Sequence, residues 1–240
     1  MCARFDPVTR PDRFKEVFGT VLPLKPDLNG FKGVTGASGS EVFPMQWAPI
    51  IRATPEGLIA GDAAPPDAEV PHHEALWACF GLVPTWAKDT TIARHTYNAR
   101  SETVATKPSF RSAWAKHQHC IVPAEAFTEP LYEAGKAHPM RIACADGLPM
   151  GIAGLWSSWR DPSDAGSPPL HSFTMLTINA DEHGLMNRFH KPGDEKRMVV
   201  ILPRGSWKAW LFATPNRMST AGREQMIRGY PAERLALQTN

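Results

Sequence analysis

Proline limits the secondary structure of this chain more than any other residue type. The 240 residues include 23 prolines, about twice the usual share of ~5%, and they are spread along the whole sequence. Because proline lacks a backbone N–H and has a fixed φ angle, it interrupts helices and central strands. The distribution therefore predicts many short strands and loops, and few long helices.

The apolar pattern between the prolines places the short elements. A helix is expected to follow Thr9, as its N-cap, and to end at Gly19, with Phe14, Val17 and Phe18 on its buried face. The other expected elements are strands at 2–5, at 47–51, within 119–176 and at 198–202, short helices at 109–117 and 206–212, and loops at 23–40, 61–73 and 160–169.

The order of these elements predicts the fold class. Hydrophobic residues make up 42% of the chain and charged residues 21%, which is typical of a globular protein. No internal repeat and no linker between domains is visible. The sequence therefore predicts one α+β domain over residues 1–240, built on a curved, mostly antiparallel, barrel-like sheet with a few short helices.

Charge and cysteine content exclude several classes of protein. The formal net charge is only +2, so any contact with nucleic acid has to be a local basic patch. No apolar run reaches the ~18 residues of a membrane span, and the first residues lack the apolar core of a signal peptide. The four cysteines are scattered without a C-x-x-C pair, which favours a reduced chain with no zinc site. A cytoplasmic protein with no membrane partner is expected.

The cysteine at position 2 is the most unusual single group. If Met1 is removed, the chain begins with Cys2, whose amine and thiol have ordinary pKa values of about 7.7–8.0 and about 8.5. Both groups are then partly nucleophilic near neutral pH. The amine condenses with an aldehyde to an imine, and the sulfur closes a five-membered thiazolidine ring. On this feature alone, a small residue after the initiator methionine is the simpler explanation.

Two further segments carry polar groups between apolar stretches. Asn98, Arg100 and Glu102 would share one face of a strand, and such a row can hold a phosphate or a sugar hydroxyl. Glu129 follows an apolar stretch and could be a general acid or base whose pKa is raised by burial, with Glu125 as a rival in the same segment. The structural alternative for the first segment is a solvent-exposed face with an Arg–Glu ion pair. The alternative for Glu129 is a glutamate on an edge strand.

A fourth segment joins a histidine to a charged turn. His190 is a possible proton shuttle near neutral pH, and Arg197 stands at the entrance of the strand predicted at 198–202. The chain has nine histidines, so a structural role for this one is the simpler alternative. No common nucleotide-binding, hydrolase or zinc motif occurs, and no metal or cofactor is expected.

Taken together and in this order, the segments resemble the SRAP family (SOS response-associated peptidase). The opening MCARF resembles M-C-G-R-F, FGLVPTWAKD at 80–89 resembles W-G-L-x-P-x-W-A, and NARSET at 98–103 resembles N-A-R-x-E-T. CIVPAEAFTEP at 120–130 resembles C-x-x-P-A-x-G-F-Y-E-W. Residues 175–202 resemble the family's ending, in which a histidine after a threonine-rich strand leads into R-M-P-V-I-L.

This resemblance implies covalent handling of abasic sites in single-stranded DNA by a monomer without a cofactor, at the nucleoid in a bacterium. It also implies a strand-cleaving lyase activity and removal of Met1 by the protein itself. The implied roles are imine and thiazolidine formation by Cys2, positioning of Cys2 and the sugar by Asn98, proton transfer by Glu129 and His190, phosphate contacts by Arg4, Arg100 and Arg197, base stacking by Phe80, and lining of the pocket by Thr177.

The chain also departs from the family pattern. These differences bear on the DNA contacts and the role expected of Arg197. They bear less on the roles expected of Cys2, Asn98, Glu129 and His190. The departing residues are Ala3, Phe80, Ala126, Thr128, Pro130 and Val199.

Two other functions stay open at this point. The first is an N-terminal-nucleophile cysteine peptidase that acts on itself or on other proteins, because a terminal amine can serve as the base. The second is a non-covalent binder of single-stranded nucleic acid that stacks bases on Phe80 and Trp86. That binder would need neither Cys2 nor Glu129, and it would hold intact and abasic strands equally well.

Overall fold

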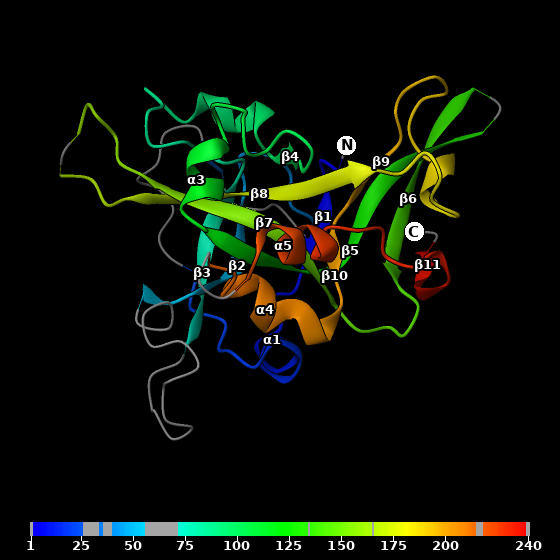
Figure 1. Cartoon of the computed structure of the whole chain (residues 1–240), viewed down its shortest axis with the longest axis horizontal. Coiled ribbons are helices and arrows are strands. Elements are labelled where there is room, and N and C mark those ends of the chain that lie inside the picture. Colours follow the sequence, from blue (N-terminus) through cyan, green and yellow to red (C-terminus); the bar gives the residue numbers. More distant parts are fainter. Residues whose placement is uncertain are drawn as a thin grey trace.

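The computed structural model of the chain describes residues 2–25, 34–35, 40–55, 72–133, 135–164, 166–214 and 218–238. The greater part of each loop predicted at 23–40 and at 61–73 lies outside the described residues. The strands are β1 Phe5–Pro7, β2 Trp47–Ala53, β3 His73–Phe80, β4 Asn98–Arg100, β5 His119–Glu133, β6 Lys136–Cys144, β7 Met150–Trp159, β8 Leu170–Asn179, β9 Arg197–Val199, β10 Ile201–Leu202 and β11 Leu235–Gln238 (Figure 1). The helices are α1 Pro11–Phe18, α3 Arg111–Ala115, α4 Trp207–Leu211 and α5 Thr220–Met226, with 3₁₀ turns η2 Thr91–His95, η3 Met186–Arg188, η4 Arg204–Ser206 and η5 Ala232–Arg234.

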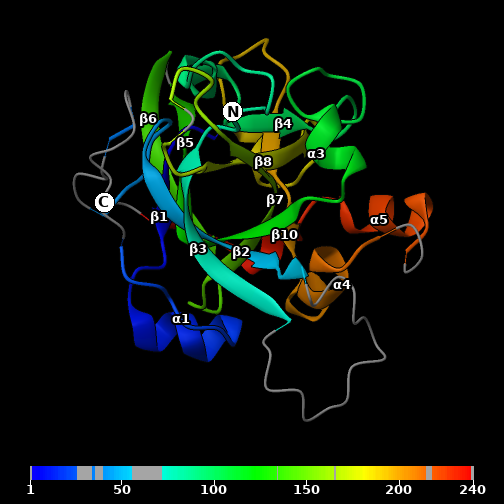
Figure 2. The same ribbon diagram turned by 90° about the vertical axis from the view of Figure 1, so that its left-hand side faces the viewer.

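Five strands close on themselves to form a barrel. Their order is β7, β8, β3, β2 and β5, and β5 pairs back to β7. Within this ring only the β3–β8 pairing is parallel. Figure 2 shows the ring with α1 and α4 outside it. The structure therefore confirms the predicted α+β class with a barrel-like, mostly antiparallel sheet and a few short helices.

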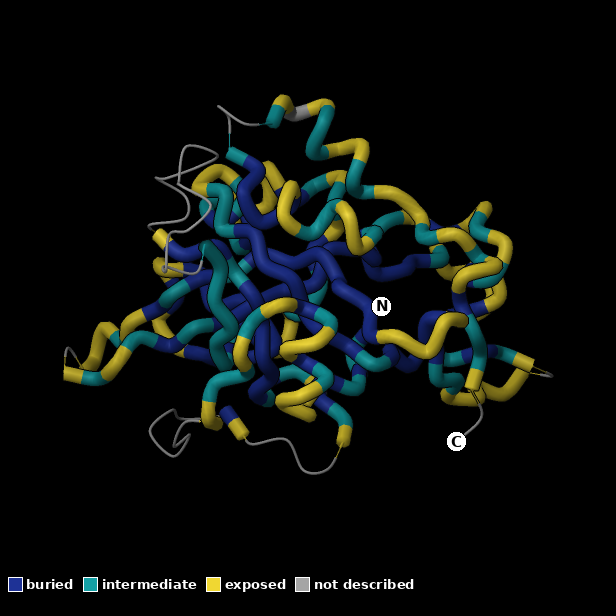
Figure 3. Tube along the Cα trace, turned by 90° about the horizontal axis from the view of Figure 1, so that it is seen from below, coloured by how far each residue is buried: buried dark blue, intermediate teal, exposed yellow. Residues whose placement is uncertain are grey.

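Strand β5 organises this sheet, and aromatic rings fill the barrel. The 15 residues of β5 pair with β1, β2, β6 and β7. Inside, the ring centroid of Phe80 lies 5.3 Å from that of Phe5 and 5.2 Å from that of Phe173, and all three side chains are fully buried. Each such ring stabilises the fold by about 1.5–3 kcal/mol. Figure 3 shows this buried interior with the exposed residues gathered on the surrounding loops.

Most predicted elements are present, with adjusted bounds. Helix α1 ends at Gly19, whose φ is 68°, as predicted, but its N-cap is Arg10 and not Thr9. The strand predicted at 2–5 begins only at its last residue, as β1, and the strand predicted at 198–202 is divided into β9 and β10. None of the helices in the described ranges is long and apolar enough to cross a membrane.

Gly81→Ala is expected to destabilise the fold. Gly81 follows β3 with φ +120°, and a Cβ there would lie 2.1 Å from the carbonyl oxygen of Ala93. Because backbone has to move, we expect the free energy of unfolding to fall by roughly 2–3 kcal/mol. Gly205→Ala is the matched control, since its Cβ would meet nothing within 4 Å. Denaturant unfolding measures both variants, and equal midpoints would contradict the expected clash.

Candidate functional site

The start of the chain runs beside the end of β5. Strand β1 pairs antiparallel with β5, and the N–H of Thr128 donates to the Arg4 carbonyl at 3.0 Å. Because the pairing is antiparallel, the residues before β1 continue along β5 toward Glu129. Cys2 is 1% exposed there, and its thiol lies 3.5 Å from the Arg4 carbonyl.

Asn98 holds Cys2 in this position. It opens β4, which pairs with β8, and its Nδ2 donates to the Cys2 carbonyl at 2.6 Å. The Oδ1 atom of Asn98 is buried and accepts no hydrogen bond from the described residues. A buried acceptor without a donor costs about 1–3 kcal/mol. The position therefore suits a ligand that brings a donor of its own.

Glu129 and His190 form a buried pair. The N–H of His190 donates to the Pro130 carbonyl at 2.9 Å, which brings the ring to β5. Its Nδ1 lies 3.4 Å from Glu129 Oε2, and its Nε2 donates to the Arg197 carbonyl at 2.8 Å. That second hydrogen bond assigns the tautomer and leaves Nδ1 to face the carboxyl group. These contacts also hold His190 at φ 64°, which is uncommon for a histidine.

Burial shifts the pKa values of the titratable side chains in this site. It raises the pKa of Glu129 to about 7 and lowers the pKa of His190. It also raises the pKa of the Cys2 thiol well above its usual value, and the charge of Glu129 adds to that rise. The pKa of Tyr97 is raised by burial and then by Cys2 and Glu129, so this ring lies close to the same group. Near pH 7 the glutamate therefore exchanges its proton readily, while the thiol keeps its own.

Glu129→Gln is expected to flatten the pH dependence of stability. A carboxyl group with an ordinary pKa of 4.5 and a folded pKa near 7 stabilises the fold in its protonated form. That contribution is fully present below pH 4.5 and is lost as the pH rises through 7, and it amounts to at most about 3 kcal/mol. Free energies of unfolding at pH 5 and pH 8 measure it. If the wild-type chain loses no more stability than the variant over this interval, the raised pKa is wrong.

The described residues that gather here define the chemistry of the site. They are a nucleophile in Cys2, a proton carrier in the Glu129–His190 pair and an anchoring amide in Asn98. Such a set can add a nucleophile to a carbonyl carbon and move the accompanying protons. No three His, Cys, Asp or Glu side chains in the described ranges come together closely enough to hold a metal ion.

Arg197 is fixed inside the protein. Its guanidinium donates to Glu102 in two hydrogen bonds of 2.9 Å, to Glu195 at 2.8 Å and to the Thr177 carbonyl at 2.8 Å. Thr177 and Arg197 are both buried. Two carboxylates neutralise the guanidinium in this packing, and the phosphate contact expected of Arg197 stays a prediction. Arg197 holds His190 through its backbone carbonyl.

The other two arginines remain at the surface, each beside a carboxylate. Arg100 pairs with Glu195 at 2.6 Å, and Arg4 pairs with Glu41. Strand β4 ends at Arg100, so Glu102 lies in the following turn and does not continue the polar row of a strand. Arg4 and Arg100 keep enough exposure for an anion to approach them.

Phe80 does not face solvent. Its fully buried ring stacks on Phe173 and lies edge-on to Tyr97, so no face of it is open to a DNA base in this structure, and the base stacking expected of Phe80 stays a prediction. The exposed aromatic ring of this segment is Trp86, which is 56% exposed and donates its indole N–H to the Pro108 carbonyl.

Comparison with known proteins assigns the chain to a family. The model of one protein family, described as SOS response associated peptidase (SRAP), matches residues 1–239. The chain belongs to the SRAP family. Abasic site processing protein YoqW of Bacillus subtilis (strain 168) is 34% identical to this SRAP chain over 155 residues, which cover 64% of the chain and 63% of YoqW. Abasic site processing protein HMCES of Gallus gallus is 27% identical over 124 residues, which cover 43% of the chain and 36% of HMCES. The chain thus spans less than two thirds of the length of these relatives.

Solved structures share the fold of this SRAP chain. A crystal structure of a protein from Bordetella bronchiseptica matches with a TM-score of 0.76 and 34% identity, covering 98% of both chains. A protein from Bacteroides thetaiotaomicron matches with a TM-score of 0.69 at 20% identity, covering 98% of this chain and 90% of that one. The second likeness concerns the fold alone.

Proposed function

We propose that this chain processes abasic sites in single-stranded DNA by binding them covalently through Cys2, as a monomer and as one SRAP-like domain over residues 1–240. The observation that carries the proposal is the position of Cys2, which Asn98 holds beside the Glu129–His190 pair. Named relatives of the chain are abasic site processing proteins. An abasic site exposes an aldehyde, the group that an N-terminal aminothiol traps. Removal of Met1, which lies outside the described residues, exposes the amine.

The covalent reaction balances with the loss of one water. The Cys2 nitrogen adds to the aldehyde carbon, and the resulting hydroxyl leaves as water after the Glu129 carboxylic acid protonates it, which gives an imine. The Cys2 sulfur then bonds to the imine carbon, and the thiol proton passes through Glu129 to the nitrogen. A carboxyl group with a pKa of about 7 can both give and take this proton. His190 keeps the carboxyl group in place and assists the reverse steps.

The same imine supports a second outcome. β-Elimination from it cleaves the strand on the 3′ side of the lesion, which would give the chain a lyase activity. Loss of the phosphate as the leaving group requires only removal of a sugar proton, a step that the Glu129 carboxylate can perform.

A basic segment that contributes Asn98 to the site would receive the strand. Residues 84–118 carry an excess of four positive charges, although the whole chain carries only +2. Its basic residues are all exposed, and they are Lys88, Arg94, Arg100, Lys107, Arg111 and Lys116. The same segment provides Asn98 to the site and presents the indole of Trp86 to solvent. Phosphates would bind the cations and a base would stack on the indole.

The test is adduct formation on a strand with one abasic site. After intact-mass measurement has shown that Met1 is gone, the wild-type chain should give a heat-stable species whose mass is the sum of both partners minus one water. An identical strand without the lesion should give none. A chain that begins with Cys2 and yet forms no such species would overturn the proposal. Turnover of a peptide without DNA crosslinking would favour the peptidase instead.

A further inference from the structure

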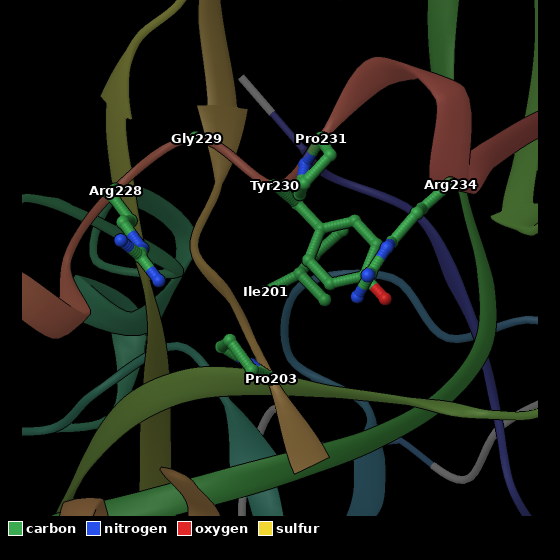
Figure 4. A pocket seen from close by; sticks show the side chains of 7 residues that line it. All are labelled: Ile201, Pro203, Arg228, Gly229, Tyr230, Pro231 and Arg234. Carbon is green, nitrogen blue, oxygen red and sulfur yellow. The ribbon is translucent and has the colours of Figure 1, made fainter. Parts of the chain in front are cut away.

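A pocket separate from Cys2 lies between β10 and the segment that joins α5 to β11. It has a volume of about 420 Å³, within the ~300–1,000 Å³ range of small-molecule sites. We call it the arginine pocket, and its lining residues are Ile201, Pro203, Arg228, Gly229, Tyr230, Pro231 and Arg234 (Figure 4).

The charge of the arginine pocket is entirely positive. Arg228 and Arg234 line it with Tyr230 between them, Arg234 donates a hydrogen bond to the Tyr230 hydroxyl, and no acidic residue is among its described lining residues (Figure 4). Neither arginine forms an ion pair within the part of the chain that the structure describes, whereas Arg4, Arg100 and Arg197 all do. Two guanidinium groups without carboxylates favour an anion, and a phosphate group above all, because its oxygens match the guanidinium fork.

The remaining walls of the pocket are apolar and flat. The half-buried ring of Tyr230 lies near Ile201, and Pro203 and Pro231 complete the lining (Figure 4). An aromatic ring between prolines offers a stacking face to a planar group. Inorganic phosphate alone would leave this surface uncovered, and an apolar ligand would make no contact with the charge of the two exposed arginines.

The wall that carries Tyr230 is held in place before any ligand binds. The Nε2 atom of His183 donates to the Tyr230 carbonyl at 2.7 Å. The Nδ1 atom of the same ring accepts from the N–H groups of Leu185 and Met186, at 3.1 and 3.0 Å. The three contacts assign one tautomer to His183 and fix the wall against the chain segment that leads to His190. A preformed wall lowers the ordering cost of binding.

We propose that the arginine pocket binds a nucleoside monophosphate unit, with the base stacked on Tyr230 and the phosphate held by Arg228 and Arg234. The unit is either a free nucleotide or part of a DNA strand. This site needs neither Cys2 nor Glu129, so it stands or fails independently of the crosslinking function.

Calorimetric titration of the whole chain tests the proposal. Deoxyadenosine 5′-monophosphate should bind more tightly than deoxyadenosine or inorganic phosphate. The double variant Arg228→Ala/Arg234→Ala should bind it about 10-fold more weakly or worse, because each lost charge-assisted hydrogen bond costs at least that factor. Tyr230→Ala should also weaken binding, whereas Arg160→Ala, at an exposed arginine of another loop, should not. Cys2→Ala should bind like the wild type. Equal thermal unfolding midpoints show that each variant is folded.

A second titration identifies the source of the nucleotide. An oligodeoxyadenylate without an abasic site should lose affinity in the double variant as much as the monophosphate does if the pocket holds a DNA strand. If only the monophosphate loses affinity, the pocket holds a free nucleotide. The proposal is overturned if the double variant binds the monophosphate as well as the wild type does. It is also overturned if an acidic peptide with a C-terminal phenylalanine binds in an arginine-dependent way and the monophosphate does not.

Discussion

Cys2→Ala is expected to abolish the heat-stable adduct with abasic single-stranded DNA. Alanine keeps the α-amine, so the variant still forms an imine with the aldehyde, but it has no sulfur to close the ring. The imine hydrolyses on heating, whereas a thiazolidine survives. Denaturing electrophoresis after heating should therefore show no shifted band for the variant, and reduction with borohydride before heating should restore one.

The controls separate the lost sulfur from a lost fold. Cys79→Ala removes another fully buried cysteine, and it should form the heat-stable adduct at the wild-type level. A Cys2→Ala protein that gives the same heat-stable band without borohydride would show that another group forms the crosslink. A variant that gives no band even with borohydride would place the amine out of reach of the aldehyde, and the geometry around Cys2 would be wrong.

Local patterns predicted most of the fold because they depend on near neighbours in the chain. Proline spacing kept the helices short, and the positive φ of Gly19 ended α1 where a glycine was available. The closure of the barrel could not be predicted this way. It depends on β5 meeting both β2 and β7, and strands that are buried on two faces lose the alternation that would show which side faces the core.

The site shows the same division between local and distant information. The ordered motifs predicted Cys2, Asn98, Glu129 and His190, and the structure brings these four residues together in one site. The contact of Arg197 with Glu102 was not predictable, because Glu102 lies 95 residues away and the chain offers 24 acidic residues, whereas the second partner of Arg197, Glu195, is close in the sequence. The burial of Phe80 was not predictable either. An aromatic residue in an apolar segment can pack in the core or stack on a base at the surface, and the sequence does not distinguish the two.

Glu129→Gln is expected to slow adduct formation by about 10²–10⁴-fold and to change the shape of its pH profile. Imine formation needs the amine without its proton, so the wild-type rate rises with pH through the pKa of the amine, ordinarily about 7.7–8.0. The departure of water needs Glu129 with its proton, so the rate falls as the pH rises above about 7. The wild-type profile should therefore be bell-shaped. Glutamine has no proton to give, and the profile of the variant should keep only the rising limb.

The shape of the profile distinguishes proton transfer from a structural role of Glu129. A variant that was only loosened near Cys2 would react more slowly at every pH and would keep the bell. Glu133→Gln is the matched control, because Glu133 ends the same strand in an exposed position, 3.9 Å from Arg188. It should preserve both the rate and the bell. If Glu129→Gln keeps the falling limb, another group supplies the proton, and His190, 3.4 Å from Glu129, is then the first residue to replace.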